Sequence, residues 1–306
     1  MMKNKVTLTK DNCKILICCH KPCELPPNED GIFLPIHVGA ANSNVDFEMQ
    51  RDDQLNGKPC DNISAKNKSY CELTALYWAW KNIKKLYPDL EYIGLNHYRR
   101  YFSFDKRDNL KTEIEKNAND IKAYNLDKTK LQKKLEKNDC VIPTQQILPY
   151  SVEVHYCLEH MSQDFRTVKA IIASDYPDYL KDFEEIACNG NKISFFNMFI
   201  MKYDDFENYC QWIFSILAKA ESLIDINSYD SVQMRVFGYL AERLFNVYVY
   251  HNFSKKCYLN VYKYVDSFSK MNRFYLFLGK TRNSLGYNLF FKRNGIVKFI
   301  KKLFKR

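Results

Sequence analysis

Short apolar runs alternate with stretches of helical periodicity along most of the chain. This alternation is typical of an α/β fold with a mainly parallel sheet. The apolar runs have the length of buried strands, which we expect at 14–20, 33–38, 91–95, 140–143, 193–201 and 247–250. Helical spacing of apolar residues predicts helices at 69–85, 151–179, 206–220 and 230–246.

The helix expected at 69–85 has the clearest pattern. Ser69 and Glu72 have the spacing of a capping box, in which each side chain bonds the backbone N–H of the other residue. The charged segment 104–138 has few apolar residues, so we expect a partly helical insertion there. The simplest partition is one domain over 1–265 and a basic, membrane-associating C-terminal segment over 266–306.

The charge of the chain is concentrated at its C-terminal end. The net charge is +10, and the last 36 residues contain ten Lys or Arg and no Asp or Glu. The rest of the chain is therefore neutral, so we expect no nucleic-acid partner. Within 295–306 the apolar residues have helical spacing, which favours an anionic membrane surface as partner. The alternative is a terminal helix that packs on the domain through the same apolar stripe.

The cysteines and the hydropathy indicate a cellular compartment. Eleven cysteines, an odd number without a Cys-x-x-Cys pair, are typical of reduced thiols in the cytoplasm. No apolar run approaches the roughly 20 residues of a membrane span. We therefore expect a cytoplasmic protein that associates with the inner face of the membrane.

Polar residues that follow the expected strands are the candidates for ligand binding, because open α/β sheets bind ligands beyond the carboxyl ends of their strands. His20 and Lys21 follow the first strand. His97, Tyr98, Arg99 and Arg100 follow the strand at 91–95. Paired guanidinium groups beside a tyrosine hydroxyl suit a diphosphate. The alternative is a surface turn whose arginines pair with nearby acids.

Two later segments add polar groups. Asn197 interrupts an apolar run, so its side chain needs a hydrogen-bond partner from the protein or from a ligand. Arg235, Gly238 and Glu242 share one face of the helix that follows Asp230. Glu242 could act there as a general base, with Gly238 leaving room for a ligand. The alternative is an ordinary solvated helix face.

Several of these residues belong to longer motifs that resemble a known family. The motifs are E-L-T-x-x-Y-W-x-W-K-N at 72–82, H-Y-R-R-Y-F at 97–102, N-M-F-I at 197–200 and R-x-x-G-Y-x-x-E-R-L at 235–244. In combination they resemble a bacterial family of capsular and exopolysaccharide glycosyltransferases, described as domain of unknown function 4422. The resemblance covers roughly residues 14–252.

The resemblance implies a GT-A-like, Rossmann-type sheet that binds a nucleotide-sugar. It implies transfer of a sugar from a UDP-sugar, of galactofuranose type, to a capsular or lipopolysaccharide glycan on a lipid carrier. Glu242 is then the first choice for the base and Asp230 the second, with inversion at the sugar carbon. The donor contacts are His20, Lys21, His97, Tyr98, Arg99, Arg100 and Asn197. Arg235, Gly238 and Arg243 would contact donor or acceptor.

The resemblance leaves the metal and the reaction type open. GT-A enzymes often carry an Asp-x-Asp that holds Mn²⁺ or Mg²⁺, but here the matching place, 96–100, reads N-H-Y-R-R. Arg99 and Arg100 could neutralise the diphosphate instead, or a carboxylate from elsewhere could recruit the metal. Two other activities remain as alternatives: a non-catalytic nucleotide- or glycan-binding subunit, and a phosphotransferase that acts on capsular sugars.

Overall fold

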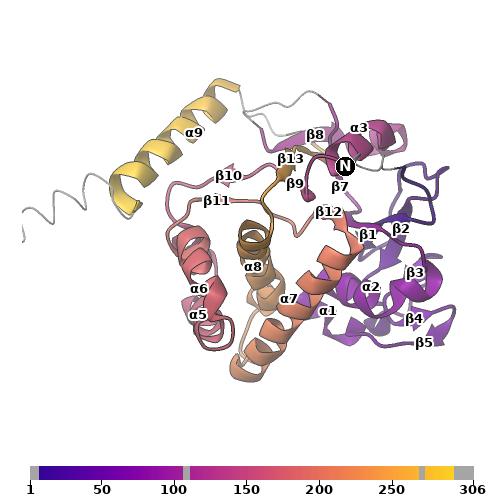
Figure 1. Cartoon of the computed structure of the whole chain (residues 1–306), viewed down its shortest axis with the longest axis horizontal. Helices are drawn as coiled ribbons and strands as arrows, with labels where there is room; N and C mark the ends of the chain where they lie inside the picture. The colour runs from indigo at the N-terminus through magenta and orange to yellow at the C-terminus, as the bar shows by residue number, and fades with distance from the viewer. Residues whose placement is uncertain (1–6, 106–110, 269–272, 293–306) are drawn as a thin grey trace, which may run out of the picture.

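The computed structural model describes residues 7–105, 111–268 and 273–292 (Figure 1). Within these residues the central sheet has ten strands, seven of which follow one another in the order β13-β9-β12-β6-β1-β2-β3. Their bounds are β1 (Cys13–Cys19), β2 (Phe33–His37), β3 (Gln50–Arg51), β6 (Tyr92–His97), β9 (Cys140–Pro143), β12 (Phe199–Lys202) and β13 (Lys256–Leu259).

The sheet is mainly parallel, as the sequence predicts. β1 lies between β2 and β6 and is parallel to both, with Ile15 opposite Phe33 on one side and Gly94 on the other. Every residue of β1 is buried, which explains its uninterrupted apolar sequence. Among the seven strands in this order, β12 is the exception: it runs antiparallel to both of its neighbours, β6 and β9.

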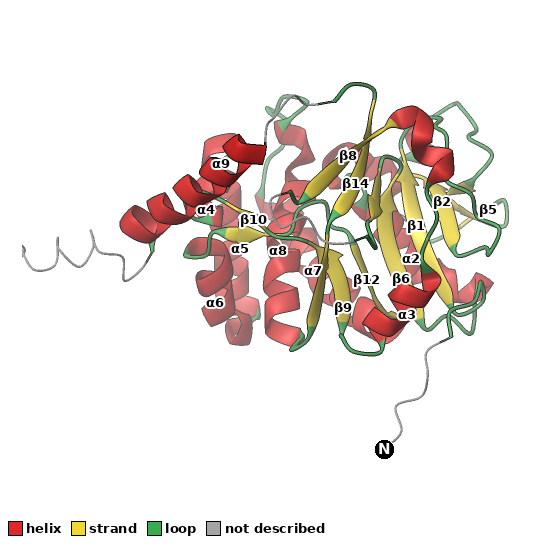
Figure 2. Ribbon diagram, turned by 90° about the horizontal axis from the view of Figure 1, so that it is seen from above, coloured by secondary structure: helices red, strands yellow, loops and turns green. Residues whose placement is uncertain are grey.

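Helices cover both faces of the sheet (Figure 2). One face packs against side chains of α2, α5, α7 and α8, and the other against α3 and β14. The helices are α1 (Asn67–Tyr70), α2 (Leu73–Leu86), α3 (Lys128–Leu135), α4 (Val152–Glu159), α5 (Ser162–Asp175), α6 (Pro177–Phe183), α7 (Tyr203–Leu223), α8 (Val236–Asn252) and α9 (Arg273–Gly286). The 3₁₀ turns are η1 (Ala40–Asn42), η2 (Ser64–Lys66), η3 (Ala118–Ala123) and η5 (Gln233–Arg235), and the π-helical turns are η4 (Glu184–Cys188) and η6 (Tyr287–Phe291).

Shorter strands complete the fold. β14 (Val261–Val265) pairs with β7 (Arg100–Phe102) and with β8 (Glu113–Asn117). Two small ribbons pair β4 (Gln54–Leu55) with β5 (Lys58–Pro59), and β10 (Gln146–Ile147) with β11 (Lys192–Ile193). The segment 104–138 is thus partly helical, as expected, but it also contains β8. That strand is rich in charged residues, so the sequence gives no apolar alternation from which to predict it.

The predicted capping box at Ser69 and Glu72 is wrong. Cys71 has a positive φ of 53° and divides the expected helix into α1 and α2. Glu72 lies at the N-cap of α2 but makes no side-chain cap hydrogen bond, and Ser69 Oγ donates to the carbonyl of Lys66 instead. The carboxylate of Glu72 is directed to Asn197, which lies in a distant part of the sequence.

Two predicted strands also differ. Residues 247–250 continue α8, because Val247, Tyr248 and Val249 pack in the same core as Leu240 and Leu244 and this packing outweighs their local strand propensity. The run at 193–201 is split: Phe196 and Asn197 have positive φ values of 81° and 51°, and β12 begins only at Phe199.

The structure tests only part of what the sequence predicts for the C-terminal segment. The amphipathic helix expected at 295–306 lies outside the described residues. Within the described ranges, α9 is the C-terminal α-helix, and no helix there has the length and hydropathy needed to cross a bilayer. All eleven cysteines are free thiols.

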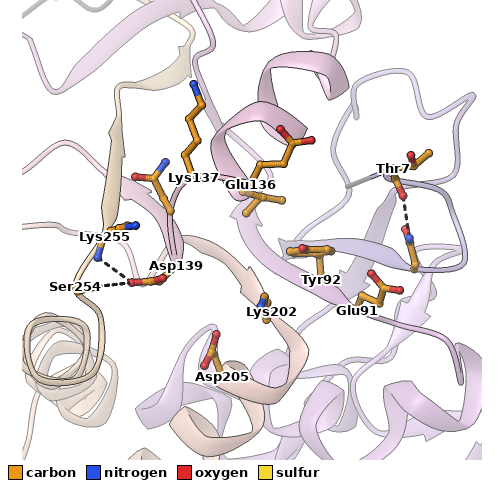
Figure 3. A pocket seen from close by; sticks show the side chains of 13 residues that line it. Thr7, Glu91, Tyr92, Glu136, Lys137, Asp139, Lys202, Asp205, Ser254 and Lys255 are labelled. Atoms are coloured by element: carbon orange, nitrogen blue, oxygen red, sulfur yellow. Dashed lines mark hydrogen bonds between the residues drawn. The ribbon is translucent and has the colours of Figure 1, made fainter. Parts of the chain in front are cut away.

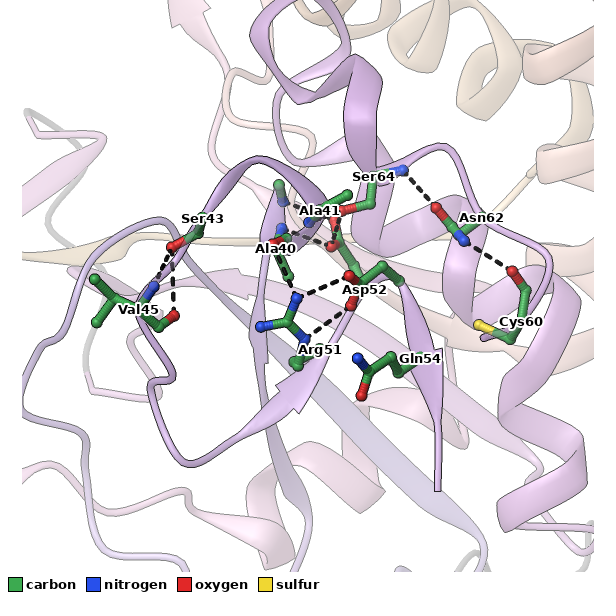
Figure 4. A network of polar contacts seen from close by, with 12 residues as sticks. Ala40, Ala41, Ser43, Val45, Arg51, Asp52, Gln54, Cys60, Asn62 and Ser64 are labelled. Carbon is green, nitrogen blue, oxygen red and sulfur yellow. Dashed lines mark hydrogen bonds and ion pairs between the residues drawn. The ribbon is translucent and has the colours of Figure 1, made fainter. Parts of the chain in front are cut away.

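A network around Asp52 fixes the loop after β2 (Figure 4). The Asp52 side chain is fully buried and accepts hydrogen bonds from the backbone N–H groups of Gly39 and Ala40, at 2.8 and 3.0 Å. Ser64 Oγ also donates to Asp52 and accepts from the N–H of Ala41, at 3.0 Å. The network therefore fastens the loop after β2 to the segment that leads into α1.

Substitution of two glycines tests whether the loop after β2 lies against Asn67. Gly39 and Gly57 share a φ of 72°, but a Cβ on Gly39 would lie 2.8 Å from atoms of Asn67, whereas a Cβ on Gly57 would meet nothing. We expect Gly57→Ala to cost about 1 kcal/mol of unfolding free energy through backbone strain alone. Gly39→Ala should cost about 1–3 kcal/mol more, because Asn67 must move.

Urea denaturation of the two variants measures this difference. Equal losses of stability would contradict the steric contact between the loop and Asn67.

Candidate functional site

The largest concentration of predicted site residues lies in a cleft of about 890 Å³ at the carboxyl ends of β1 and β6. Its lining includes Glu72, at the N-cap of α2, and Glu242, in α8. Six predicted residues line it: His20, His97, Tyr98, Arg100, Arg235 and Glu242. The parallel pairing of β1 and β6 brings the first four together, because parallel strands end at the same edge.

Glu242 is held in place by two hydrogen bonds. Its Oε1 accepts from the backbone N–H of Phe196 at 2.7 Å, and its Oε2 accepts from Arg243 Nη1 at 3.0 Å. The side chain is only 15% exposed. Burial raises the pKa of Glu242 above its ordinary value, against the opposing effect of Arg243. The carboxylate is thus fixed and is a stronger base than a solvated one.

Glu72 is a second carboxylate in the cleft, and sequence reasoning did not assign it to the site. Its Oε1 accepts from Asn197 Nδ2 at 2.7 Å, so the hydrogen-bond partner expected for Asn197 comes from the protein. Asn197 itself is buried and does not line the cleft. Burial raises the pKa of Glu72 as well. In the sequence, the need of the Asn197 side chain for a hydrogen-bond partner was the signal for this contact, but it did not identify Glu72 as that partner.

His97 is a neutral hydrogen-bond donor. Its Nε2–H donates to the carbonyl of Phe196 at 2.7 Å. Burial lowers the pKa of His97 to about 4, so the ring carries no charge near pH 7. His97 and Glu242 therefore hold the same residue, Phe196, by its carbonyl and its N–H. This fixes the left-handed turn that forms the back of the cleft.

Cations surround the two carboxylates. The Arg100 guanidinium lies 4.4 Å from the centre of the Phe196 ring, and its Nε pairs with Glu113 Oε2 at 3.4 Å. Arg235 donates from Nε to Cys71 Sγ at 3.4 Å, and Lys68 also lines the cleft. Three cationic side chains in one cleft of this size suit the charge of a diphosphate.

The predicted pair of arginines is divided between two cavities. Arg100 lines the cleft, but Arg99 and Lys21 line a separate cavity of about 270 Å³ that Tyr98 shares. Arg99 Nη1 pairs there with Asp266 Oδ2 at 2.9 Å. Arg99 lies in the turn that follows β6, whereas Arg100 is the first residue of β7, so strand alternation does not relate their side chains.

Three other predicted residues have structural roles. Gly238 lets α8 approach Cys71, since a Cβ would lie 3.1 Å from Cys71 Sγ, so its small size is used for packing. Arg243 is 3% exposed and acts on the cleft through Glu242. Asp230 Oδ1 accepts from the N–H groups of Val232 and Gln233, both at 2.8 Å, and does not line the cleft.

The donor groups in the cleft do not fit a divalent cation. Among the described residues no three His, Cys, Asp or Glu side chains come together as a metal site. Glu72 and Glu242 already accept hydrogen bonds from Asn197, Phe196 and Arg243. At 96–100, where an Asp-x-Asp motif would hold a metal, this chain has Arg100, whose cationic side chain lines the cleft.

A second large pocket, of about 830 Å³, lies at the opposite edge of the sheet (Figure 3). Side chains of both signs line it, including Glu91, Lys202 and Asp205. Asp139 accepts there from the N–H of Lys255 at 2.8 Å. None of the predicted site residues lines this pocket, and it lies at the amino ends of β6 and β9. The cleft is therefore the candidate site.

Comparison with known proteins agrees with the motifs. A family model described as domain of unknown function (DUF4422) matches residues 14–253. Among solved structures, the chain is similar to the apo structure of the bifunctional glycosyltransferase WbbM, with 29% identity and a TM-score of 0.71. The match covers 83% of this chain and 45% of that one, so this chain spans less than half of its length. No curated protein matches the chain.

The environment of Glu72 has a consequence for stability. A pKa raised in the folded state means that folding takes up protons, so stability falls as the pH rises from the unfolded pKa through the higher folded one. A glutamine side chain at this position would have no such titration and could still accept from Asn197. We therefore expect Glu72→Gln to stabilise the protein more at pH 8 than at pH 5.

Urea unfolding of both proteins at the two pH values measures this difference. A difference in stability that does not change with pH would show that the Glu72 carboxyl is solvated in the folded protein.

Proposed function

The chain belongs to the family described as domain of unknown function 4422, and from this premise we propose that it is a glycosyltransferase. It moves a sugar from a UDP-sugar to a hydroxyl group of a growing capsular or lipopolysaccharide glycan. The observation that carries the proposal is the cleft, where a fixed carboxylate faces the same space as three cationic side chains. The similarity to a glycosyltransferase over most of the chain supports it.

The cationic side chains suit the donor. Arg100, Arg235 and Lys68 would bind the diphosphate, and His20 and Tyr98, whose rings are 5.1 Å apart, would contact the nucleotide. As the bond to the sugar breaks, negative charge grows on the leaving diphosphate. Fixed cations stabilise that charge more in the transition state than in the bound donor. We propose a donor of galactofuranose type.

Glu242 suits the base. An acceptor hydroxyl oxygen attacks the anomeric carbon, the bond from that carbon to the diphosphate oxygen breaks, and the hydroxyl proton passes to Glu242. Attack from the side opposite the leaving group inverts the configuration. General-base catalysis of this kind contributes about 10²–10⁴-fold in rate. Phe196 and Arg243 orient the carboxylate for this step.

The donor set of the cleft supports a reaction without a divalent cation. Arg100 and Arg235 line the cleft and would supply the positive charge that a metal would otherwise bring to the diphosphate. We propose that the acceptor glycan is attached to a lipid carrier and that the protein works in the cytoplasm at the inner face of the membrane.

Replacement of the base tests the proposal. We expect Glu242→Gln to lower the rate of transfer at least about 100-fold, because the proton acceptor is lost. Binding of UDP should change little, because Glu242 does not carry the charge that binds a diphosphate. The measurements are turnover of UDP-sugars with a glycan acceptor and calorimetric titration with UDP. Asp230→Asn is the control and should keep its activity, since Asp230 lies outside the cleft.

The outcome separates the alternatives. A new glycosidic bond identifies a glycosyltransferase, and a phosphorylated product identifies a phosphotransferase. Binding of UDP without turnover of any sugar donor would identify a binding subunit and overturn the proposal.

The two adjacent arginines provide a matched pair for the donor site. Arg100→Met should weaken UDP binding about 10–100-fold, which corresponds to the loss of one charge-assisted hydrogen bond. Arg99→Met should have little effect, because Arg99 faces the other cavity and pairs with Asp266. Thermal shift and calorimetry with UDP, GDP, CMP and TDP, each with and without EDTA, measure the effects.

Equal losses in both variants would place the diphosphate across Tyr98 and contradict the assignment of the cleft. Loss of UDP binding in EDTA would contradict the metal-free site.

A further inference from the structure

Helix α9 lies at one side of the molecule, beside the ribbon of β10 and β11 and away from the central sheet (Figures 1 and 2). Two hydrogen bonds hold its C-terminal part to the rest of the chain. Asn283 Nδ2 donates to the carbonyl of Ile147 at 3.0 Å, and the Tyr287 hydroxyl, just beyond the helix, donates to the carbonyl of Asn189. One side of α9 therefore faces the body, and the other faces solvent.

The solvent side of α9 is the more apolar one. Seven positions from 274 to 286 are exposed, and five of these carry large hydrophobic side chains. They are Phe274, Tyr275, Phe277, Leu278 and Leu285, which are 44–67% exposed. The less exposed positions of the helix are Leu276, Gly279, Lys280, Asn283, Ser284 and Gly286, of which only Leu276 carries a large hydrophobic side chain. A helix that only packs on its own domain has the opposite arrangement.

The exposed residues form one stripe. Phe274, Leu278 and Leu285 are four and eleven residues apart, which places them on the same side of an α-helix, and Phe277 lies beside them. Phe268, which is 57% exposed, precedes the helix. Exposed hydrophobic residues on the body, such as Leu158 and Leu223, belong to different helices. Contiguous exposed apolar surface of this kind marks an interaction site.

The charges of the C-terminal segment indicate which kind of partner the stripe binds. The segment 271–306 contains ten Lys or Arg and no acid, and Arg282 is exposed on the same side of α9 as the stripe. We propose that the outward face of α9 docks on an anionic lipid bilayer. The aromatic and aliphatic side chains would enter the interface, while the basic residues contact the headgroups. A segment whose charges all have one sign fits a bilayer better than a protein, whose surface carries both signs.

The inference does not rest on the proposed transfer reaction, since it concerns binding alone. Within the basic segment 266–306, for which the sequence predicts membrane association, it assigns the contact to a described helix. It also gives the proposed lipid-linked acceptor a physical route to the protein, because docking confines both to the same surface.

Co-sedimentation of the full chain with vesicles tests the proposal. We expect binding to vesicles of phosphatidylcholine that contain phosphatidylglycerol, little binding to phosphatidylcholine alone, and weaker binding as salt is added. The double variant Phe274→Ser, Phe277→Ser should lower the partition coefficient at least about tenfold, because two aromatic side chains no longer enter the interface. The double variant Leu158→Ser, Leu223→Ser removes two equally exposed residues from the body and should bind as the unmodified chain does.

Thermal unfolding of both variants checks that the domain stays folded. Absence of binding to the anionic vesicles at low salt would overturn the proposal. Unchanged binding of the Phe274, Phe277 variant would also overturn it, because the contact would then lie elsewhere in the chain. A concentration-dependent dimer in the analytical ultracentrifuge that this variant abolishes would show that the face binds a second copy. Since no sugar donor is present, failure here is distinct from failure of the transfer reaction.

Discussion

The hydrogen bond from the Phe196 N–H to Glu242 is the interaction on which the site depends. It connects α8 to the turn before β12, and that turn has two consecutive residues in the left-handed region. Such a conformation is costly for residues other than glycine and persists only where its surroundings fix it. Glu242 fixes it at the N–H, and His97 fixes it at the carbonyl. The Glu242 carboxylate, the turn at Phe196 and the end of β6 are thus positioned relative to one another.

The same arrangement buries two carboxylates in one cleft, which is electrostatically unfavourable. Burial raises the pKa of both Glu72 and Glu242, and repulsion from Glu72 raises that of Glu242 further. Arg243 offsets part of the cost at Glu242, and Asn197 does so at Glu72. A solvated surface would avoid this cost, but it would not provide a base of fixed direction. Strongly perturbed titratable groups that face one cleft are the physical signature of a functional site.

Much of the fold could be predicted from the sequence, because buried parallel strands such as β1 are apolar throughout and α7 shows its packing face at helical spacing. Residues 247–250 could not be assigned correctly, since their β-branched and aromatic side chains suit a strand and only tertiary packing makes them helical. Within the site, His20, His97, Arg100 and Glu242 were predictable from their positions after strands or on one helix face. Glu72 was not, because its partner Asn197 is 125 residues away, and neither was the direction of Arg99 relative to Arg100.

The reversed direction of β12 has a mechanical consequence. An antiparallel strand begins where its parallel neighbours end, so the turn at Phe196 reaches the edge of the cleft without a crossover helix. Ladder hydrogen bonds hold β12 on both sides, to β6 and to β9. The turn that holds the Glu242 carboxylate therefore leads directly into a strand that is bonded on both sides. A displacement of β9, which supplies none of the residues that line the cleft, would be transmitted through β12 to the carboxylate.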